Sequence, residues 1–168
     1  MRVAVTGTPG TGKTTATDRL DADLDVVHLN EVVREEGLYD EVDEERDSVV
    51  ADLDSVAERV SDRDEVVLDS HLSHHLNVDR VVVLRCHPEA LERRLRERGE
   101  TDAKAEENAE SEALDVILAE AVDAHGPENV YEIDTTDRDP DAVARDISAA
   151  IAGEREPSAG TVSFIEYL

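Results

Sequence analysis

The chain has 168 residues, the length of a single domain with a sizeable core. Aspartate and glutamate number 43 against 17 lysine plus arginine, so the formal net charge is −26. This excess argues against direct nucleic-acid binding by the bulk surface, because phosphates would be repelled. Regular apolar periodicity argues against disorder. The composition therefore favours a folded domain with a solvated acidic shell, as expected in a halophilic cytoplasm where salt screens self-repulsion.

Two further features bear on the cellular compartment. Cys86 is the single cysteine, which excludes an internal disulfide and suits a reducing environment. No apolar run approaches the roughly 20 residues of a membrane span, and the N-terminal residues do not resemble a signal peptide. We therefore expect a cytoplasmic location and no membrane partner.

The first predicted element is a buried strand over Arg2–Thr6, an apolar run that leads into a glycine-rich stretch. Residues 7–14, GTPGTGKT, fit the pattern G-x-x-x-x-G-K-[ST] of the phosphate-binding P-loop, or Walker A motif. A helix over 14–20 is expected next, because no proline or glycine interrupts it. Strand, glycine loop and helix together form the context that this motif requires.

The residue types of the motif indicate how it would hold a nucleotide. Its glycines let the backbone turn N–H groups toward phosphate oxygens, and the helix N-terminus adds partial positive charge. Lys13 would reach the β- and γ-phosphates of ATP, and the Thr14 hydroxyl would bind Mg²⁺. The sequence therefore predicts an ATP and Mg²⁺ site at this loop.

Four more strands are predicted by short apolar runs without alternation, which are typical of a parallel sheet covered on both faces. They are expected at 26–29, 65–69, 80–85 and 130–133. Strands alternate with predicted helices along the chain, so the fold class is α/β with a mostly parallel sheet and no second domain. In such a fold the active groups lie at the carboxyl ends of the strands.

The helices between these strands are predicted from apolar spacing and from boundary residues. They are expected over 30–36 with Asn30 as cap, over 52–61, from Pro88 to Gly99 and over 140–151. One long helix, with Leu114 facing inward, is expected from the loop after Gly99 to about Ala124. Residues 38–51 are expected to form a mobile acidic loop, 153–160 a linker and 162–168 an apolar tail.

Asp69 ends the predicted strand at 65–69, where P-loop proteins place the second carboxylate of the Mg²⁺ site; the alternative is an ordinary solvated aspartate. His71 follows closely and could orient water or phosphate, or be a neutral structural histidine. His71 and His75 have the i, i+4 spacing of zinc ligands. The lack of a nearby cysteine and of a predicted helix disfavours zinc on His71, His74 and His75.

Arginines on two segments could close over a transferring phosphoryl group, which needs positive charge in its transition state. Arg34 lies in the helix before the acidic loop, while Arg94 and Arg98 lie next to Gly99. The alternative for each is a solvated arginine on a helix surface.

The sequence resembles the small nucleoside monophosphate kinases called the adenylate kinase isoenzyme six family, shared by archaea and eukaryotes. Four matches over residues 1–125 carry the resemblance. They are the P-loop through Thr15; Arg34-Glu35-Glu36 with Leu38-Tyr39-Asp40 and Asp43-Glu44-Glu45; Asp69-x-His71; and Leu91-x-x-Arg94-Leu95-x-x-Arg98-Gly99 with Lys104, Asn108 and Glu112. Glu100 and Ser70 depart from the family, which commonly has aromatic residues there, and residues 153–168 have no family match.

The resemblance implies a P-loop NTPase three-layer fold with five parallel strands in the order 2-3-1-4-5. It implies one kinase domain over 1–152 with a mobile monophosphate-binding segment at 28–51 and a lid at 97–107, followed by the tail 153–168. The implied ATP contacts are Gly10, Gly12, Lys13, Thr14, Thr15 and Arg98. The catalytic residues are expected to be Lys13, Arg34, Arg98, Asp69 and His71, with Thr14 and Asp69 holding Mg²⁺.

We expect an ATP-dependent, broad-specificity nucleoside monophosphate kinase with AMP as the favoured acceptor and with ATPase activity. The resemblance further implies a role in late small-ribosomal-subunit (16S rRNA) maturation, with a small-subunit ribosomal protein and the pre-ribosomal 30S particle as partners. Two alternatives remain: a nucleotide-switched assembly factor with incidental kinase activity, and a P-loop kinase of another small metabolite. A non-enzymatic module is disfavoured because Lys13, Thr14 and Asp69 are all present.

Overall fold

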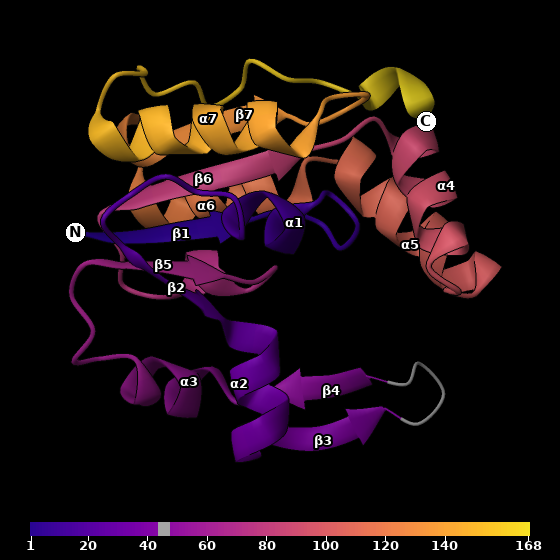
Figure 1. Ribbon diagram of the computed structural model, residues 1–168. Helices are drawn as coiled ribbons and strands as arrows, with labels where there is room; N and C mark the ends of the chain where they lie inside the picture. The colour runs from indigo at the N-terminus through magenta and orange to yellow at the C-terminus, as the bar shows by residue number, and fades with distance from the viewer. Residues whose placement is uncertain (44–47) are drawn as a thin grey trace.

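The computed structural model describes residues 1–43 and 48–168. Its centre is a parallel sheet of five strands in the order β2-β5-β1-β6-β7 (Figure 1). The strands are β1 (Arg2–Thr6), β2 (Asp25–His28), β5 (Val66–Asp69), β6 (Arg80–Arg85) and β7 (Val130–Asp134). Counted along the chain, these five have the order 2-3-1-4-5, so the predicted α/β fold and strand order are confirmed.

Helices cover both faces of this sheet, which explains the apolar runs without alternation. On one face, Val3 and Val5 pack with Ala16 of α1 (Lys13–Thr17) and Ile147 of α7 (Pro140–Ala152). On the other face, Ala4 packs with α6 (Val116–His125). Farther along that second face, α2 (Leu29–Glu36) and α3 (Leu53–Arg59) pack on β5. The sheet is therefore the middle of three layers.

The helix after the P-loop is shorter than predicted, because α1 ends at Thr17 and turns follow to Leu20. The predicted cap of the next helix is wrong. Helix α2 begins at Leu29 with His28 as its N-cap, and Asn30 lies in the first turn, where its Oδ1 accepts a hydrogen bond of 3.0 Å from Ser70 Oγ. The amide that would have capped the helix instead contacts the loop after β5.

The acidic stretch after α2 was expected to be a loop, and this expectation is wrong for its described part. Strands β3 (Tyr39–Asp43) and β4 (Ser48–Ala51) pair antiparallel as a hairpin (Figure 1). Val49 and Ala51 turn back onto the cluster formed by α2 and α3. Glu44 and Glu45, which belong to the resemblance, lie outside the described residues.

The predicted long helix is two helices. Helix α4 (Pro88–Glu97) is followed by α5 (Asp102–Ala113), and α6 begins only at Val116. Between α5 and α6, Asp115 has φ of 56° and Leu114 is 54% exposed rather than inward. A tertiary contact accompanies this break, since the Asp115 carboxylate pairs with Arg85 of β6 at 2.5 Å.

The last residues are not a free linker. After α7, Ser158 N donates to Val130 O of β7 at 3.0 Å, and Glu132 Oε2 accepts from Thr161 N at 2.8 Å. The last described element is the short 3₁₀ turn η3 (Ile165–Tyr167), and two more such turns, η1 (Ser73–His75) and η2 (Pro127–Asn129), occur earlier in the described chain. Among the described residues, no helix combines the length and apolar character that crossing a bilayer requires.

Candidate active site

A cleft of about 820 Å³ opens at the carboxyl ends of the central strands. Its walls are the P-loop, the α2 and hairpin segment, the loop after β5 and the end of α4 with α5. Every site residue predicted from the sequence lines it: Gly10, Gly12, Lys13, Thr14, Thr15, Arg34, Asp69, His71 and Arg98. Side chains from four separate parts of the chain therefore share one cavity.

The P-loop needs glycine at particular positions. Gly7 has φ of 149°, and a Cβ there would lie 2.6 Å from Leu84 O; Gly10 has φ of 95°, and its Cβ would lie 2.9 Å from Leu91 Cδ1. Gly12 faces open space but also has φ of 95°, in the left-handed region. The loop thus lies tightly between the end of β6 and α4 while its mouth stays open toward the cleft.

Lys13 is buried inside this loop. Its Nζ donates to Gly7 O at 2.9 Å and to Thr8 O at 3.2 Å. Burial lowers the pKa of Lys13 to about 8, although the nearby Asp69 carboxylate opposes that shift. A polyphosphate bound in the loop would add negative charge beside this ammonium and favour its charged form.

Asp69 is the centre of the polar cluster next to Lys13. This buried carboxylate accepts from Thr14 Oγ1 at 2.9 Å and lies 2.6 Å from His28 Nδ1 through the same oxygen, Oδ2. His28 also contacts Asp18 at 2.9 Å. Burial acts to lower the pKa of His28, but the hydrogen bonds to Asp69 and Asp18 outweigh burial and raise that pKa.

Sequence reasoning missed His28 as a site residue. The available signal was its position at the end of β2, because β2 and β5 are neighbours and their carboxyl ends meet, with His28 paired in register to Asp69. The position of His28 points to a contact with Asp69 only when the order of the strands in the sheet is known.

His71 lies half-buried on the loop after β5 and lines the cleft. Burial lowers its pKa to about 4, and the positive charge of Lys13 acts in the same direction. The imidazole is therefore neutral around pH 7, so one of its nitrogens donates a hydrogen bond and the other accepts one. The three histidines do not form one cluster: among the described residues, His74 and His75 meet Glu120 of α6 without His71.

Arg34 and Arg98 approach the cleft from different walls. Arg34 lies in the last turn of α2, Arg98 follows the last residue of α4, and both side chains are exposed. Arg94 behaves differently, because its Nη2 donates to Thr135 O at 3.1 Å and its Nη1 to Gly10 O at 3.4 Å. Arg94 thus fastens the P-loop to the loop after β7.

A second cavity, of about 430 Å³, lies on the other side of the P-loop. It shares Gly10, Gly12, Thr15 and Arg98 with the cleft and adds Pro140 and Val143 from the start of α7 and Arg138 from the segment just before it. Arg98 therefore lies at the junction of the two cavities. The smaller one has the mixed polar and apolar lining that suits a flat heterocycle.

The two departures from the family pattern make contacts of their own. Ser70 is buried, donates to Asn30 Oδ1 at 3.0 Å and accepts from Leu72 N at 3.1 Å. Glu100 lines the cleft and forms an ion pair with Lys104 at 3.2 Å. Polar contacts thus occupy both positions where aromatic rings are common.

A buried ion network supports the loop from behind and was not predicted. Arg85 of β6 pairs with Glu112 at 3.2 Å, with Glu132 at 2.6 Å and with Asp115 at 2.5 Å. Glu112 Oε1 also accepts from Thr8 Oγ1 of the P-loop at 3.2 Å. Burial acts to lower the pKa of Arg85, but the carboxylates outweigh burial and raise that pKa, so the guanidinium stays charged. The network joins the P-loop, α5 and β7.

The chain has relatives of its full length. Residues 3–115 match the family model described as AAA domain. A protein of Natronomonas pharaonis named "Putative adenylate kinase" is 62% identical over 168 residues, with 100% of both chains covered. Proteins with the same name are 60% identical over 169 residues in Halobacterium salinarum, with 100% of both chains covered, and 41% identical over 174 residues in Methanocaldococcus jannaschii, with 99% of this chain and 94% of that one covered.

Solved structures agree on the fold. Shikimate kinase from Bacteroides thetaiotaomicron matches with a TM-score of 0.61 and 16% identity, covering 90% of this chain and 98% of that one. Deoxyadenosine kinase from M. mycoides, with bound dATP, matches with a TM-score of 0.59 and 12% identity, covering 90% of this chain and 100% of that one. The site geometry, the fold and the full-length identities lead to one conclusion: the chain belongs to the same family as these archaeal proteins, the family of small P-loop proteins named for adenylate kinase.

Proposed function

We propose that the protein is a cytoplasmic, ATP-dependent nucleoside monophosphate kinase of broad specificity, with AMP as the favoured acceptor. One observation carries the proposal: Lys13, Thr14 and Asp69 converge at one end of a cleft that Arg34 and Arg98 enter from opposite segments. The names of the relatives support the same activity.

The donor would lie with its phosphates in the P-loop and its base in the smaller cavity beside Pro140 and Val143. Backbone N–H groups of the loop and the N-terminus of α1 would hold the phosphate oxygens. Lys13 would move from the carbonyls of Gly7 and Thr8 to the β- and γ-phosphates. Arg98, at the junction of the two cavities, would contact donor phosphates from the lid side.

The residues next to Lys13 fit Mg²⁺. The Thr14 hydroxyl and the Asp69 carboxylate are hard oxygen donors only 2.9 Å apart, and Mg²⁺ prefers one or two protein oxygens together with water and phosphate. When bound, Mg²⁺ neutralises charge on the β- and γ-phosphates. The same Asp69 oxygen, Oδ2, contacts both the Thr14 hydroxyl and His28 Nδ1.

The acceptor would lie against α2 and the hairpin, where Val33, Val49 and Ala51 form an apolar wall beside Arg34. Arg34 would bind the phosphate of the acceptor and align one oxygen of that phosphate with the γ-phosphorus of ATP. That oxygen forms the new P–O bond while the bond from the γ-phosphorus to the β–γ bridging oxygen breaks, so ATP and AMP yield two ADP. Positioning and charge account for the catalysis, and no side chain becomes a covalent nucleophile.

We propose hydrolysis as a second activity of the same site. The neutral His71 side chain lines the cleft, and the charge of Lys13 is close enough to lower its pKa. This position supports a role for His71 in orienting a water that takes the place of the acceptor. His71→Ala is then expected to lower ATPase activity at least as much as transfer to AMP. If hydrolysis is unchanged in His71→Ala, the histidine is structural. A role in 16S rRNA maturation, with a small-subunit ribosomal protein and the pre-30S particle as partners, is proposed from the family resemblance alone.

A coupled assay with a panel of nucleoside monophosphates in high salt tests the kinase proposal. ADP formation should depend on the added monophosphate, should be fastest with AMP and should vanish in Lys13→Met, with the folded state intact by circular dichroism. Turnover with a different small phosphate acceptor, and none with any monophosphate, would favour the metabolite-kinase alternative. Hydrolysis that only a ribosomal partner stimulates would favour the assembly-factor alternative.

A further inference from the structure

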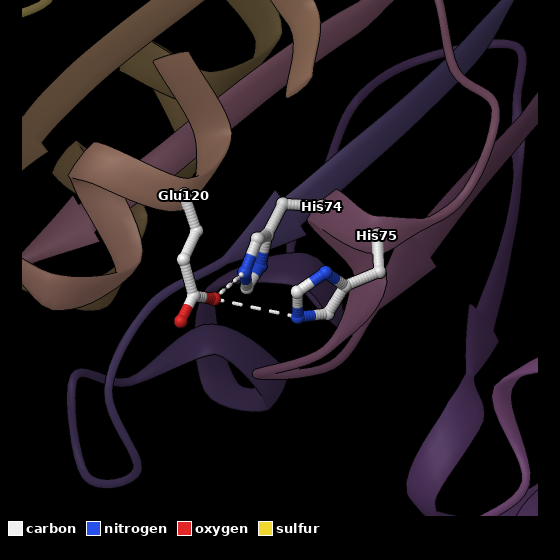
Figure 2. Close-up of side chains that lie close together, drawn as sticks. All are labelled: His74, His75 and Glu120. Carbon is white, nitrogen blue, oxygen red and sulfur yellow. Dashed lines mark hydrogen bonds and ion pairs between the residues drawn. The ribbon is translucent and has the colours of Figure 1, made fainter. Parts of the chain in front are cut away.

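A cluster of three metal-binding side chains lies away from the nucleotide cleft, between η1 and α6. Figure 2 shows His74 and His75 facing the carboxylate of Glu120 from the neighbouring helix. His74 Nε2 lies 2.7 Å and His75 Nε2 lies 3.3 Å from the same oxygen, Glu120 Oε2. The three ligand atoms lie within 4.8 Å of one another.

This ligand set selects a class of ion. Two imidazole nitrogens and one carboxylate suit a divalent transition metal, whereas Mg²⁺ and Ca²⁺ prefer oxygen ligands alone. In a tetrahedral zinc site with bonds of about 2.0 Å, ligand atoms lie roughly 3.3 Å apart, so small side-chain movements bring these three to that spacing. Three protein ligands leave a fourth position for water, as in the open zinc sites of other proteins.

The surroundings hold one ligand rigidly and leave the others accessible. The His74 side chain is 1% exposed, while those of His75 and Glu120 are 35% and 43% exposed. An ion can therefore arrive from solvent at the two outer ligands and be fixed by the inner one.

Two hydrogen-bonding groups hold His74 on the side away from Glu120. Its Nδ1 lies 2.7 Å from the buried Thr6 hydroxyl, and its backbone oxygen lies 2.7 Å from His125 Nε2. A metal-binding histidine uses its other ring nitrogen to donate to an oxygen, which fixes the tautomer and the ring. The Thr6 hydroxyl can accept from Nδ1–H, so the ion can replace the proton that Nε2 of His74 shares with Glu120 and bind the Nε2 lone pair.

We propose that His74, His75 and Glu120 form a site for one divalent transition ion, with Zn²⁺ as the best fit. The ion would cross-link the connection after β5, which carries Asp69 and His71, to helix α6. Because Thr6 directly precedes Gly7, the same site would also fix the chain where it enters the P-loop. The site is separate from the oxygen ligands proposed for Mg²⁺ and does not depend on the kinase proposal.

Cobalt(II) is the probe that reports ligands directly. Titration of the wild-type protein in concentrated KCl with excess Mg²⁺, which blocks surface carboxylates, should saturate at one equivalent. The visible d–d bands should be those of a four- or five-coordinate ion, and Zn²⁺ should abolish them. Octahedral Co²⁺ bands only, or no saturation at one equivalent, would overturn the proposal.

Variants at the two exposed ligands avoid disturbing the core around His74. His75→Gln and Glu120→Gln should each weaken Co²⁺ binding by at least about 100-fold, more than the usual effect of removing a group that only hydrogen-bonds to a metal ligand. Asp123→Asn removes one exposed charge from the same helix, and His87→Gln removes one histidine elsewhere, so both should bind like wild type. Equal binding by all four variants would contradict the assignment.

Thermal stability gives a second readout that needs no activity. Zn²⁺ binds the folded site only, so it should raise the melting temperature of the wild type and of Asp123→Asn. The rise should be absent in His75→Gln and in Glu120→Gln. The same rise in all of these proteins would place the zinc elsewhere and overturn the site.

Discussion

Lys13 shows how one side chain can be poised for a ligand by its surroundings. Its ammonium is buried among the loop carbonyls of Gly7 and Thr8, and burial brings its pKa down to about 8. The loop by itself thus stabilises this charge poorly. A bound polyphosphate reverses that balance, because opposite charge within a few ångströms favours the ammonium.

We therefore expect proton uptake when nucleotide binds. At pH 9 the free protein carries Lys13 mostly neutral, since its pKa is about 8, whereas a bound triphosphate raises the pKa back toward the ordinary value of 10.5. Titration calorimetry at pH 9 in buffers of different ionisation enthalpy should give uptake approaching one proton per ATP. The phosphates of free ATP are fully ionised at this pH and add nothing. Absence of uptake would mean that Lys13 is already charged in the empty loop.

The local motif predicted the residues of the P-loop, because eight adjacent positions suffice to define that structure. Other members of the cleft and its support could not be found that way. His28 meets Asp69 only because β2 pairs with β5, and Glu112 meets Thr8 across 104 residues of chain. Glu120 completes the histidine pair from a helix 46 residues away from His74. Such contacts depend on tertiary packing that a linear pattern does not contain.

At the scale of elements, the five strands of the parallel sheet were predicted well, whereas the hairpin and the break between α5 and α6 were not. Continuous apolar runs define buried parallel strands, and no competing signal obscures them. In the hairpin, acidic residues such as Asp40 and Glu41 hide the strand pattern, while packing of Val49 on α2 and α3 favours it. The break between α5 and α6 has no proline or glycine, and the local sequence gives no sign that Asp115 pairs with Arg85.

The Arg85 network should be essential for holding these elements together. Arg85→Met leaves Glu112 and Glu132 buried without a counter-charge, so it should lower the free energy of unfolding by about 3 to 5 kcal/mol. Denaturant unfolding measures this directly. Arg59→Met is the matched control, because Arg59 pairs with Glu36 at an exposed site, where water screens the pair, and its loss should change the free energy of unfolding far less. Similar small losses in both variants would mean that the buried carboxylates are protonated or hydrated.

At the scale of the whole molecule, the net charge of −26 dominates. The core itself has ordinary apolar packing on both faces of the sheet, so the excess charge lies mainly on the surface. Its repulsion opposes the compact state, and salt screens it over a Debye length of roughly 10 Å at 0.1 M and 3 Å at 1 M.

Thermal unfolding should therefore depend strongly on KCl. The melting temperature should rise steadily from dilute to molar KCl, because screening removes repulsion in the folded state more than in the expanded chain. Scanning calorimetry over this series is the measurement. A melting temperature that does not change with KCl would refute the acidic-shell interpretation.

The central claim is that one cleft transfers phosphate from ATP to a monophosphate held by Arg34. ATP labelled at its γ-phosphate, incubated with unlabelled AMP in high salt, tests it by the position of the label. In the wild type the label should appear in ADP. In Arg34→Ala transfer should fall about a hundredfold or more, the cost of one lost positioning contact of roughly 2.7 to 4 kcal/mol, while release of labelled phosphate changes little. Label that never enters ADP in the wild type, or equal loss of transfer and hydrolysis in Arg34→Ala, would contradict this account.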